Sequence, residues 1–314
     1  MSAPLHIVTG AGPVGSTVAQ QLVEQGISVR MLTRSGSGPD HPLIERRRVD
    51  VADRDRLAAE LQGASAVHHC VHGTKYRTAT WRRELPPMDR GLLAVAGEAG
   101  AVVVFPESLY SYGPVEGVIT EDGPREATQG KLGVRADLLR AREASDTPTV
   151  SVAASDFFGP RVRTSHAGER LIPRILAGRT VSVVGSLDQP HSFTYVPDLA
   201  RAMVTASLDP SLWDSFLHAP TVEAGTQRQL IEAIASTAGV QSPKMFAIPS
   251  WFFKAVGTVA VDMRELAETS YQFDRPFVMD SRSSEERLGQ TPTPFEQQVK
   301  ETVAWWRSEG TPAR

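Results

Sequence analysis

The stretch Gly10-Ala11-Gly12-Pro13-Val14-Gly15 decides the fold predicted for this chain. It follows a short apolar run, residues 5–9, and it opens a helical pattern over residues 16–23. A strand, a Gly-x-Gly-x-x-Gly loop and a helix in that order are typical of a dinucleotide-binding site. The first glycine permits a tight turn, the second lets a pyrophosphate approach the backbone, and the third lets helix and strand pack closely. The N–H groups that open the helix then face the phosphate charge. The alternative is an ordinary glycine turn.

Strand and helix patterns alternate through the first half of the chain. This alternation predicts an α/β fold, a Rossmann-type doubly wound parallel sheet. After residue 153 the alternation becomes irregular. We therefore expect a dinucleotide-binding domain over residues 1–153 and a smaller substrate-binding lobe over residues 154–314, interleaved with the last strands and helices of the first domain. The expected strands lie at residues 27–32, 45–49, 66–71, 101–105, 149–153, 180–184 and 216–218. The expected helices lie at residues 16–24, 53–61, 88–97, 134–144, 166–177, 197–207, 227–239 and 295–306.

The bulk composition excludes several classes of protein. The chain has 314 residues, a net charge of −3 and 22% charged residues, so nothing favours a nucleic-acid or membrane partner. A single cysteine excludes an internal disulfide and fits a reducing, cytoplasmic location. Residues 1–4 show no basic region before an apolar segment, which predicts no signal peptide. No spacing of Cys and His indicates a metal site.

The end of the second expected strand indicates which cofactor binds. In this fold an acid there favours the free 2′-hydroxyl of NAD, and an arginine accommodates the 2′-phosphate of NADP. The segment carries Arg34 and Ser35 and no acid, so we expect NADP(H), with NAD as the alternative. Arg34 is otherwise a solvated loop residue. Asp50 and Val51, after the third strand, are expected beside the adenine, although Asp50 equally suits the cap of the helix that starts near Asp53.

Several further segments carry short motifs whose order and spacing along the chain are informative. They are residues 8–15, 50–51, 108–114, 156–160, 193–198 and 288–292. Together they resemble the extended short-chain dehydrogenase/reductases, the NAD-dependent epimerase/dehydratase family. The resemblance implies a doubly wound sheet with a C-terminal lobe that closes over the substrate. The glycine loop is one residue shorter than the usual extended pattern, and in this it is similar to the atypical branch of the superfamily, some of whose members lack full catalytic machinery.

The resemblance also implies a catalytic group, and this chain lacks part of it. In the family a tyrosine moves the proton on the substrate oxygen, a lysine four residues later lowers the pKa of that tyrosine, and a serine polarises the oxygen. Ser108 matches the serine and lies just beyond a buried strand, where it equally suits a turn. Lys131 stands in place of the tyrosine and Arg135 in place of the lysine. Their spacing puts both on one helix face, so Arg135 keeps the cation for the nicotinamide ribose while the proton donor is missing.

Three explanations for the missing tyrosine stay open. Another residue supplies the proton, with Tyr110 favoured over Tyr112, which in the family shapes the substrate pocket. Lys131 itself acts as the acid, if burial and Arg135 depress its pKa. Or the protein binds the cofactor without turnover. Further candidates for the proton donor follow the fourth strand: His72, Lys75 and Tyr76.

The substrate side departs from the nucleotide-sugar enzymes of the family. They often hold a pyrophosphate with an arginine near the place where this chain has His191, and imidazole does not match a bidentate arginine. The substrate residues expected here are His72, Tyr76, Tyr112, Phe157, Phe158 and His191, although the aromatic rings equally suit core packing.

These observations predict an NADP(H)-dependent oxidoreductase that acts on a small, fairly apolar carbonyl or hydroxyl compound with a non-standard proton donor. One alternative is a sugar-nucleotide epimerase or dehydratase. Another is a catalytically silent NADP(H)-binding sensor or partner subunit. A homodimer through the helices at residues 88–97 and 134–144 is the expectation that the resemblance gives for assembly.

Overall fold

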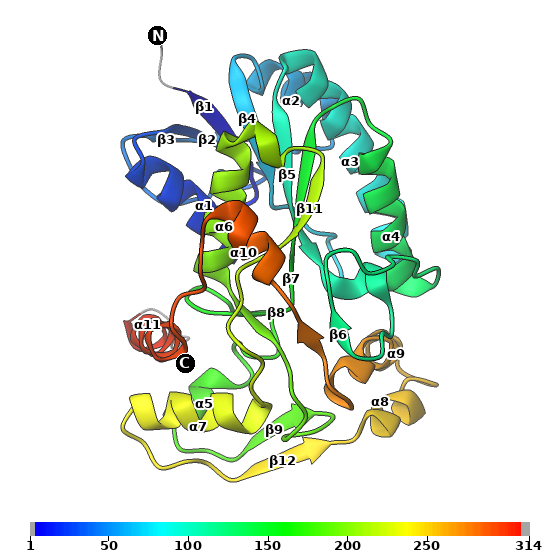
Figure 1. Cartoon of the computed structure of the whole chain (residues 1–314), viewed down its shortest axis with the longest axis vertical. Helices are drawn as coiled ribbons and strands as arrows, with labels where there is room; N and C mark the ends of the chain where they lie inside the picture. Colours follow the sequence, from blue (N-terminus) through cyan, green and yellow to red (C-terminus); the bar gives the residue numbers. More distant parts are fainter. Residues whose placement is uncertain (1–3, 309–314) are drawn as a thin grey trace.

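A parallel sheet of seven strands forms the centre of the computed structural model, which describes residues 4–308. The strand order is β11-β7-β5-β4-β1-β2-β3 (Figure 1). This arrangement confirms the expected α/β, Rossmann-type doubly wound fold. The strands are β1 (Leu5–Thr9), β2 (Ser28–Thr33), β3 (Ile44–Arg48), β4 (Ala64–His69), β5 (Val102–Ser108), β7 (Thr149–Ala154) and β11 (Ser215–His218).

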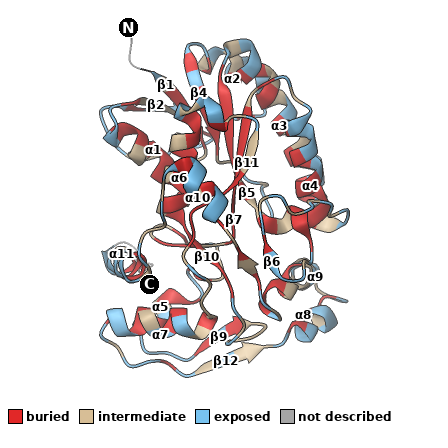
Figure 2. Cartoon of the chain, in the orientation of Figure 1, coloured by how far each residue is buried: buried red, intermediate tan, exposed pale blue. Residues whose placement is uncertain are grey.

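Helices cover both faces of this sheet, and the central strands are buried on both sides (Figure 2). In β5, Val102 and Val104 pack into the apolar layer under one set of helices, while Val103 and Phe105 pack into the opposite layer. This alternation explains why the strand reads as a continuous apolar run. One face carries α1 (Pro13–Glu24) and α6 (Val196–Leu208), and the other carries α2 (Arg54–Glu60), α3 (Thr78–Ala99) and α4 (Gly130–Glu143).

A second apolar core lies below the carboxyl edge of the sheet, in the lobe drawn at the bottom of Figure 1. Three short parallel pairs belong to the segments around it: β8 (Asp156–Phe158) with β10 (Phe193–Tyr195), β9 (Val181–Val184) with β12 (Met245–Ile248), and β6 (Val118–Ile119) with β13 (Val278–Met279). The helices of this core are α5 (Ile172–Leu176), α7 (Gln227–Thr237) and α11 (Phe295–Ser308). The remaining helices are α8 (Ser250–Val256), α9 (Val261–Ala267) and α10 (Arg282–Leu288), of which α10 packs against α6. Because α6 and β11 return to the first sheet, the two halves of the sequence interleave.

Two expected helices have different bounds in the structure. The helix expected at residues 88–97 begins ten residues earlier, at Thr78, and runs through Pro86 and Pro87, which a sequence pattern treats as a helix boundary. The helix expected at 166–177 is reduced to α5, because the chain turns at Gly168, whose N–H bonds the Ser165 carbonyl at 3.1 Å.

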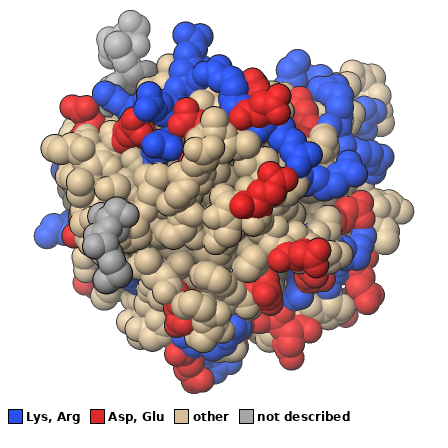
Figure 3. All heavy atoms as spheres, turned by 90° about the horizontal axis from the view of Figure 1, so that it is seen from above, with Lys and Arg blue, Asp and Glu red and all other residues tan. Residues whose placement is uncertain are grey.

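Acidic and basic side chains are interspersed on the face seen in Figure 3, in keeping with the small net charge of −3. Among residues 4–308, no helix combines the length and apolar character needed to cross a membrane. The start of the chain, on which the expectation of no signal peptide rests, lies mostly outside the described residues.

Candidate active site

The three loop glycines have different surroundings. Gly10 has a φ of +84°, and a Cβ there would lie 2.9 Å from the Cys70 carbonyl oxygen. A Cβ on Gly15 would lie 2.0 Å from the Gly10 oxygen, so this glycine lets α1 approach β1. A Cβ on Gly12 would meet no described atom within 4 Å, and its φ of −72° suits any residue. The first and third glycines are therefore required by packing, and the second leaves open space at the start of α1.

The N-terminus of α1 borders that open space. Gly12 is its N-cap and makes no side-chain cap hydrogen bond, and Pro13 occupies the first turn. Val14 is buried in the core under the loop. First-turn N–H groups without a capping side chain form a site for an anion. The residues present therefore fit the pyrophosphate of a dinucleotide.

The expected adenosine end lies at the ends of β2 and β3. Arg34 and Ser35 are exposed, and Arg48 Nε donates to the Arg34 carbonyl at 3.0 Å. The Arg34 guanidinium contacts no acid within the described range. Asp50 Oδ1 accepts from the Ala52 N–H at 3.1 Å, whereas the cap of α2 is Asp53, so the alternative role of Asp50 as a helix cap is wrong. Val51, the expected neighbour of Asp50 at the adenine, is buried in the core.

Ser108 ends β5 at the carboxyl edge of the sheet, beside a buried charge network. Its hydroxyl donates to Glu107 Oε1 at 3.2 Å, and its N–H donates to the same oxygen at 2.7 Å. Arg135 lies 3.4 Å from Glu107 and 5.0 Å above the ring of Trp81. Arg142 binds the other oxygen of Glu107 at 2.9 Å. Glu107 thus fixes both Ser108 and Arg135 at this edge.

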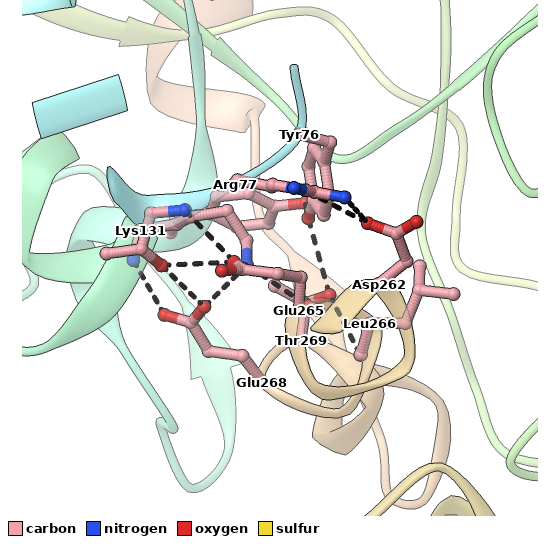
Figure 4. A network of polar contacts seen from close by, with 10 residues as sticks. Tyr76, Arg77, Lys131, Asp262, Glu265, Leu266, Glu268 and Thr269 are labelled. Carbon is pink, nitrogen blue, oxygen red and sulfur yellow. Dashed lines mark hydrogen bonds and ion pairs between the residues drawn. The ribbon is translucent and has the colours of Figure 1, made fainter. Parts of the chain in front are cut away.

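Lys131 is completely buried, and its ammonium group is held by α9 (Figure 4). Nζ donates to Glu265 Oε2 at 2.6 Å, to Glu268 Oε2 at 2.5 Å and to the Glu265 carbonyl at 2.9 Å. The hypothesis of a proton-donating Lys131 rests on burial and on Arg135, and it stays a prediction. The structure adds that two carboxylates and a carbonyl bind the N–H donors of the ammonium group, so Lys131 is an anchor for α9.

The same helix also binds the starts of α3 and α4. Glu268 Oε1 accepts the Lys131 N–H at 2.6 Å, and Glu265 Oε2 accepts the Thr78 N–H at 3.0 Å. Arg77 adds an ion pair of 2.8 Å with Asp262. Carboxylates at helix N-termini are favourable because they satisfy unpaired N–H groups and meet the positive end of the helix dipole. Lys131 and the starts of α3 and α4 are therefore fastened to α9 and its C-cap.

Two tyrosine hydroxyl groups meet beside this anchor. Tyr76 Oη and Tyr110 Oη are 2.7 Å apart, and Tyr76 Oη is 3.4 Å from Thr269 Oγ1. Lys131 Nζ lies 4.7 Å from the centre of the Tyr76 ring. Burial raises the pKa of Tyr110 well above its ordinary value, and the neighbouring Tyr76 and Asp156 raise it further. Tyr110 is therefore a weaker acid than an ordinary tyrosine and stays protonated at neutral pH.

The remaining expected substrate residues are divided between the site and the core. His72 packs against Trp81 with ring centres 4.6 Å apart. Phe158 is completely buried in the core of the second lobe, and Phe157 packs against the first core. Tyr112 is buried too, and its hydroxyl donates to the Thr120 carbonyl at 2.9 Å. The aromatic pattern could not separate these positions, because core rings and pocket rings share the same residue types.

Sequence reasoning missed several residues at this edge. Glu265 and Glu268 have the i, i+3 spacing of one helix face, yet nothing in the sequence links them to a lysine 134 and 137 residues away. Asp156 belongs to residues 156–160, one of the segments that resemble the family, but the sequence predicted no role for it. In the structure it pairs with His191 at 2.8 Å. Within residues 4–308 no group of three or more His, Cys, Asp or Glu side chains is arranged to hold a metal ion.

Comparison with known proteins shows the family of the chain. Residues 6–213 match the profile of the NAD dependent epimerase/dehydratase family, and the chain belongs to that family. In sequence the chain is 22% identical to the uncharacterized protein y4nG of Sinorhizobium fredii (strain NBRC 101917 / NGR234), over 96% of this chain and 78% of that protein.

Solved structures share the fold. The Bordetella bronchiseptica enzyme WbmH in complex with NAD+ has a TM-score of 0.78 at 18% identity, covering 98% of this chain and 100% of that one. The Thermotoga maritima UDP-glucose 4-epimerase with UDP-glucose has a TM-score of 0.77 at 18% identity, with the same shares covered. DesIV, a dTDP-glucose 4,6-dehydratase of Streptomyces venezuelae, has a TM-score of 0.75 at 20% identity over 97% of each chain.

Proposed function

We propose that this chain is an NADP(H)-dependent oxidoreductase that acts on a small, fairly apolar carbonyl or hydroxyl compound. The observation that carries the proposal is the open space at Gly12, at the carboxyl end of β1, on the same sheet edge as Ser108. Only β4 separates β1 from β5, so these two strands are about 10 Å apart in the sheet, by two strand spacings. Ligands bind at this edge in open α/β sheets.

The side chains at the edge suit the handling of a carbonyl oxygen. The nicotinamide, when bound, supplies or accepts the hydride. Ser108, held at its backbone N–H by Glu107, turns its hydroxyl proton from Glu107 to the substrate oxygen and polarises that oxygen by donating a hydrogen bond. Tyr110 supplies the proton in the direction of reduction, its hydroxyl partner Tyr76 returns one to it, and Tyr76, which is 38% exposed, takes a proton from solvent. Arg135 keeps a positive charge beside the nicotinamide ribose.

The preference for NADP(H) rests on Arg34, which is exposed beyond β2 and contacts no acid in the described structure. Titration of the protein with NADPH and with NADH, followed by the fluorescence of the bound nicotinamide, tests it. We expect tighter NADPH binding, and we expect Arg34→Ala to lose about tenfold in NADPH affinity while NADH affinity is kept. Arg54→Ala, which removes an exposed arginine paired with Glu98, is the matched control. Equal or tighter NADH binding by the unaltered protein contradicts the preference.

A sugar-nucleotide epimerase or dehydratase is the second candidate. It is supported by the names of the similar structures, among them a UDP-glucose 4-epimerase and a dTDP-glucose 4,6-dehydratase. His191 lies where those enzymes often carry an arginine, which weighs against it. Incubation with UDP- and dTDP-hexoses and chromatography of the products separates the two candidates, since only this one predicts new sugar nucleotides.

A catalytically silent NADP(H)-binding protein is the third candidate, and the use of Lys131 as an anchor supports it. This candidate predicts cofactor binding and no change in nicotinamide absorbance with any carbonyl compound. A homodimer through α3 and α4 and a cytoplasmic location also remain proposals. Sedimentation of the purified protein tests the dimer.

A further inference from the structure

A carboxylate outside the expected site residues, Asp156, follows the strand that pairs with β5 at Ser108. In the pairing of β5 with β7, Ser108 stands opposite Ala154, and Asp156 begins β8 two residues later. Asp156 Oδ2 lies 2.8 Å from Nε2 of His191, which precedes β10, the strand that pairs with β8. The charge of Asp156 acts on Tyr110, which places the carboxylate on the side of the proposed proton donor.

The contacts of this pair define the state of Asp156. His191 Nδ1 lies 3.1 Å from the Gln272 carbonyl oxygen, which only accepts, so Nδ1 carries a proton. Burial raises the pKa of Asp156, but the hydrogen bond and charge of His191, with the charge of His166, outweigh burial and hold that pKa below its ordinary value. Asp156 is therefore an ionised carboxylate at neutral pH.

The two side chains differ in what they present to a ligand. The His191 side chain is 2% exposed, whereas the Asp156 side chain is 17% exposed. The imidazole lies parallel to Phe273 with ring centres 4.6 Å apart, and Phe277 stacks at 5.5 Å. The imidazole is therefore enclosed by aromatic rings. In the described residues no donor binds the second oxygen of Asp156, Oδ1, so the partly exposed carboxylate keeps a free acceptor.

The neighbouring anchor carries more carboxylate than cation. Two carboxylates, Glu265 and Glu268, surround the single ammonium of Lys131. The negative charge of Glu107 is balanced by Arg135 and Arg142, which form ion pairs with it. A half-buried site with excess carboxylate repels phosphate and carboxylate groups, and the free oxygen of Asp156 needs a donor when a substrate excludes water.

We infer that Asp156 determines substrate specificity in this site and selects compounds that carry an ammonium group near the reacting oxygen. The inference rests on the proposed oxidoreductase function, and it names the substrate class as amino alcohols or amino carbonyl compounds. Phosphorylated and carboxylated compounds are excluded by the same carboxylate.

Three compounds that share one carbinol test this inference by binding alone. They are 2-amino-1-phenylethanol, 1-phenyl-1,2-ethanediol and mandelate, whose end groups are an ammonium, a hydroxyl and a carboxylate. Each is titrated into the protein loaded with NADPH at neutral pH, and the fluorescence of bound NADPH reports binding. We expect the amine to bind about tenfold more tightly than the diol and mandelate to bind most weakly.

Variants of the carboxylate make the test specific. Asp156→Asn should remove the preference for the amine while NADPH affinity is kept, and Asp156→Glu should retain it if the charge is what matters. Asp188→Asn, at an exposed carboxylate paired with Arg228, is the control that should change nothing. Mandelate binding as tightly as the amine, no binding of the amine, or an unchanged preference in Asp156→Asn overturns the inference. If the amine preference holds but no compound is turned over, the proposed oxidoreductase function fails and the inference stands.

Discussion

Gly12 and Gly15 are separated by two residues, but packing excludes a side chain only at Gly15. Gly15 has no room for a side chain because the Gly10 oxygen would lie 2.0 Å from its Cβ. Gly12 has room on every described side, so the fold does not explain its lack of a side chain. A ligand that approaches the backbone does explain it.

Substitution of these glycines separates folding from binding. Gly12→Ala should leave the free energy of unfolding unchanged within about 0.5 kcal/mol and weaken NADPH binding about tenfold, because the new methyl group meets only the ligand. Gly15→Ala should cost at least about 2 kcal/mol of stability, because α1 must move away from the loop. Urea unfolding and NADPH fluorescence measure the two effects. Normal NADPH binding by a folded Gly12→Ala variant would exclude this loop as the phosphate site.

At the scale of residues, the sequence predicted those features that depend on neighbouring residues in the chain. The glycine loop and the position of Ser108 after a buried strand depend on neighbours in the chain, and the structure has both at the carboxyl edge. The partners of Lys131 depend on a helix more than 130 residues away. A lysine in place of a tyrosine therefore looked like a lost or altered acid, whereas the structure shows an anchored cation.

At the scale of elements, α9 is held mainly by polar contacts. Its carboxylates bind Lys131, the Thr78 N–H and Arg77, and its seven residues contain no buried side chain. A short helix without a buried face has no periodic pattern of apolar residues in its sequence. For this reason α9 was not among the expected helices. Sequence reasoning did predict α4, whose Lys131 and Arg135 both reach charged partners.

Removal of the anchor tests the assignment of Lys131. Lys131→Met should destabilise the protein by about 2 kcal/mol, less than the roughly 3–5 kcal/mol of a fully buried pair, because Glu268 is 23% exposed. Adding Glu265→Gln and Glu268→Gln should recover part of the loss, since no unpaired charge then remains. Arg140→Met, at an exposed ion pair with Asp137, should change stability by less than about 1 kcal/mol. A Lys131→Met variant as stable as the parent would contradict the anchor.

At the scale of the whole molecule, the sheet contains several buried histidines. His6 and His68 contact each other at 3.3 Å between β1 and β4, and His69 lies next in β4. Burial lowers the pKa of His6 from 6.5 to about 4, and that of His69 to about 4 as well. The folded protein therefore holds these side chains neutral.

This burial predicts sensitivity to acid. Because the unfolded chain binds protons near pH 6.5 and the folded chain only near pH 4, stability is complete above pH 6.5 and is lost as the pH falls toward 4. For a shift from 6.5 to about 4, each histidine contributes up to ~3 kcal/mol to that loss. Urea unfolding at a series of pH values measures it. His6→Gln should reduce the slope, and His41→Gln, at an exposed position, should leave it unchanged; a flat profile between pH 6.5 and 4.5 would contradict the account.

The overall architecture was predictable because it depends on repeated local patterns. Apolar strands such as β5 and the amphipathic helices around them recur along the chain, and their alternation leaves few topologies. The assignment of aromatic residues to core or site was not predictable. Phe158 and Tyr112 lie in cores whose walls come from distant segments.

The central claim is that the edge at Ser108 performs hydride-transfer chemistry with bound NADPH. The most direct measurement is the initial rate of nicotinamide absorbance loss with a panel of small ketones and aldehydes, amino ketones included, for the parent protein and for Ser108→Ala. The account predicts turnover by the parent and a rate about 100-fold lower for Ser108→Ala at unchanged NADPH affinity, because one donor to the substrate oxygen is lost. No absorbance change with any compound, or an undiminished rate in Ser108→Ala, would contradict it.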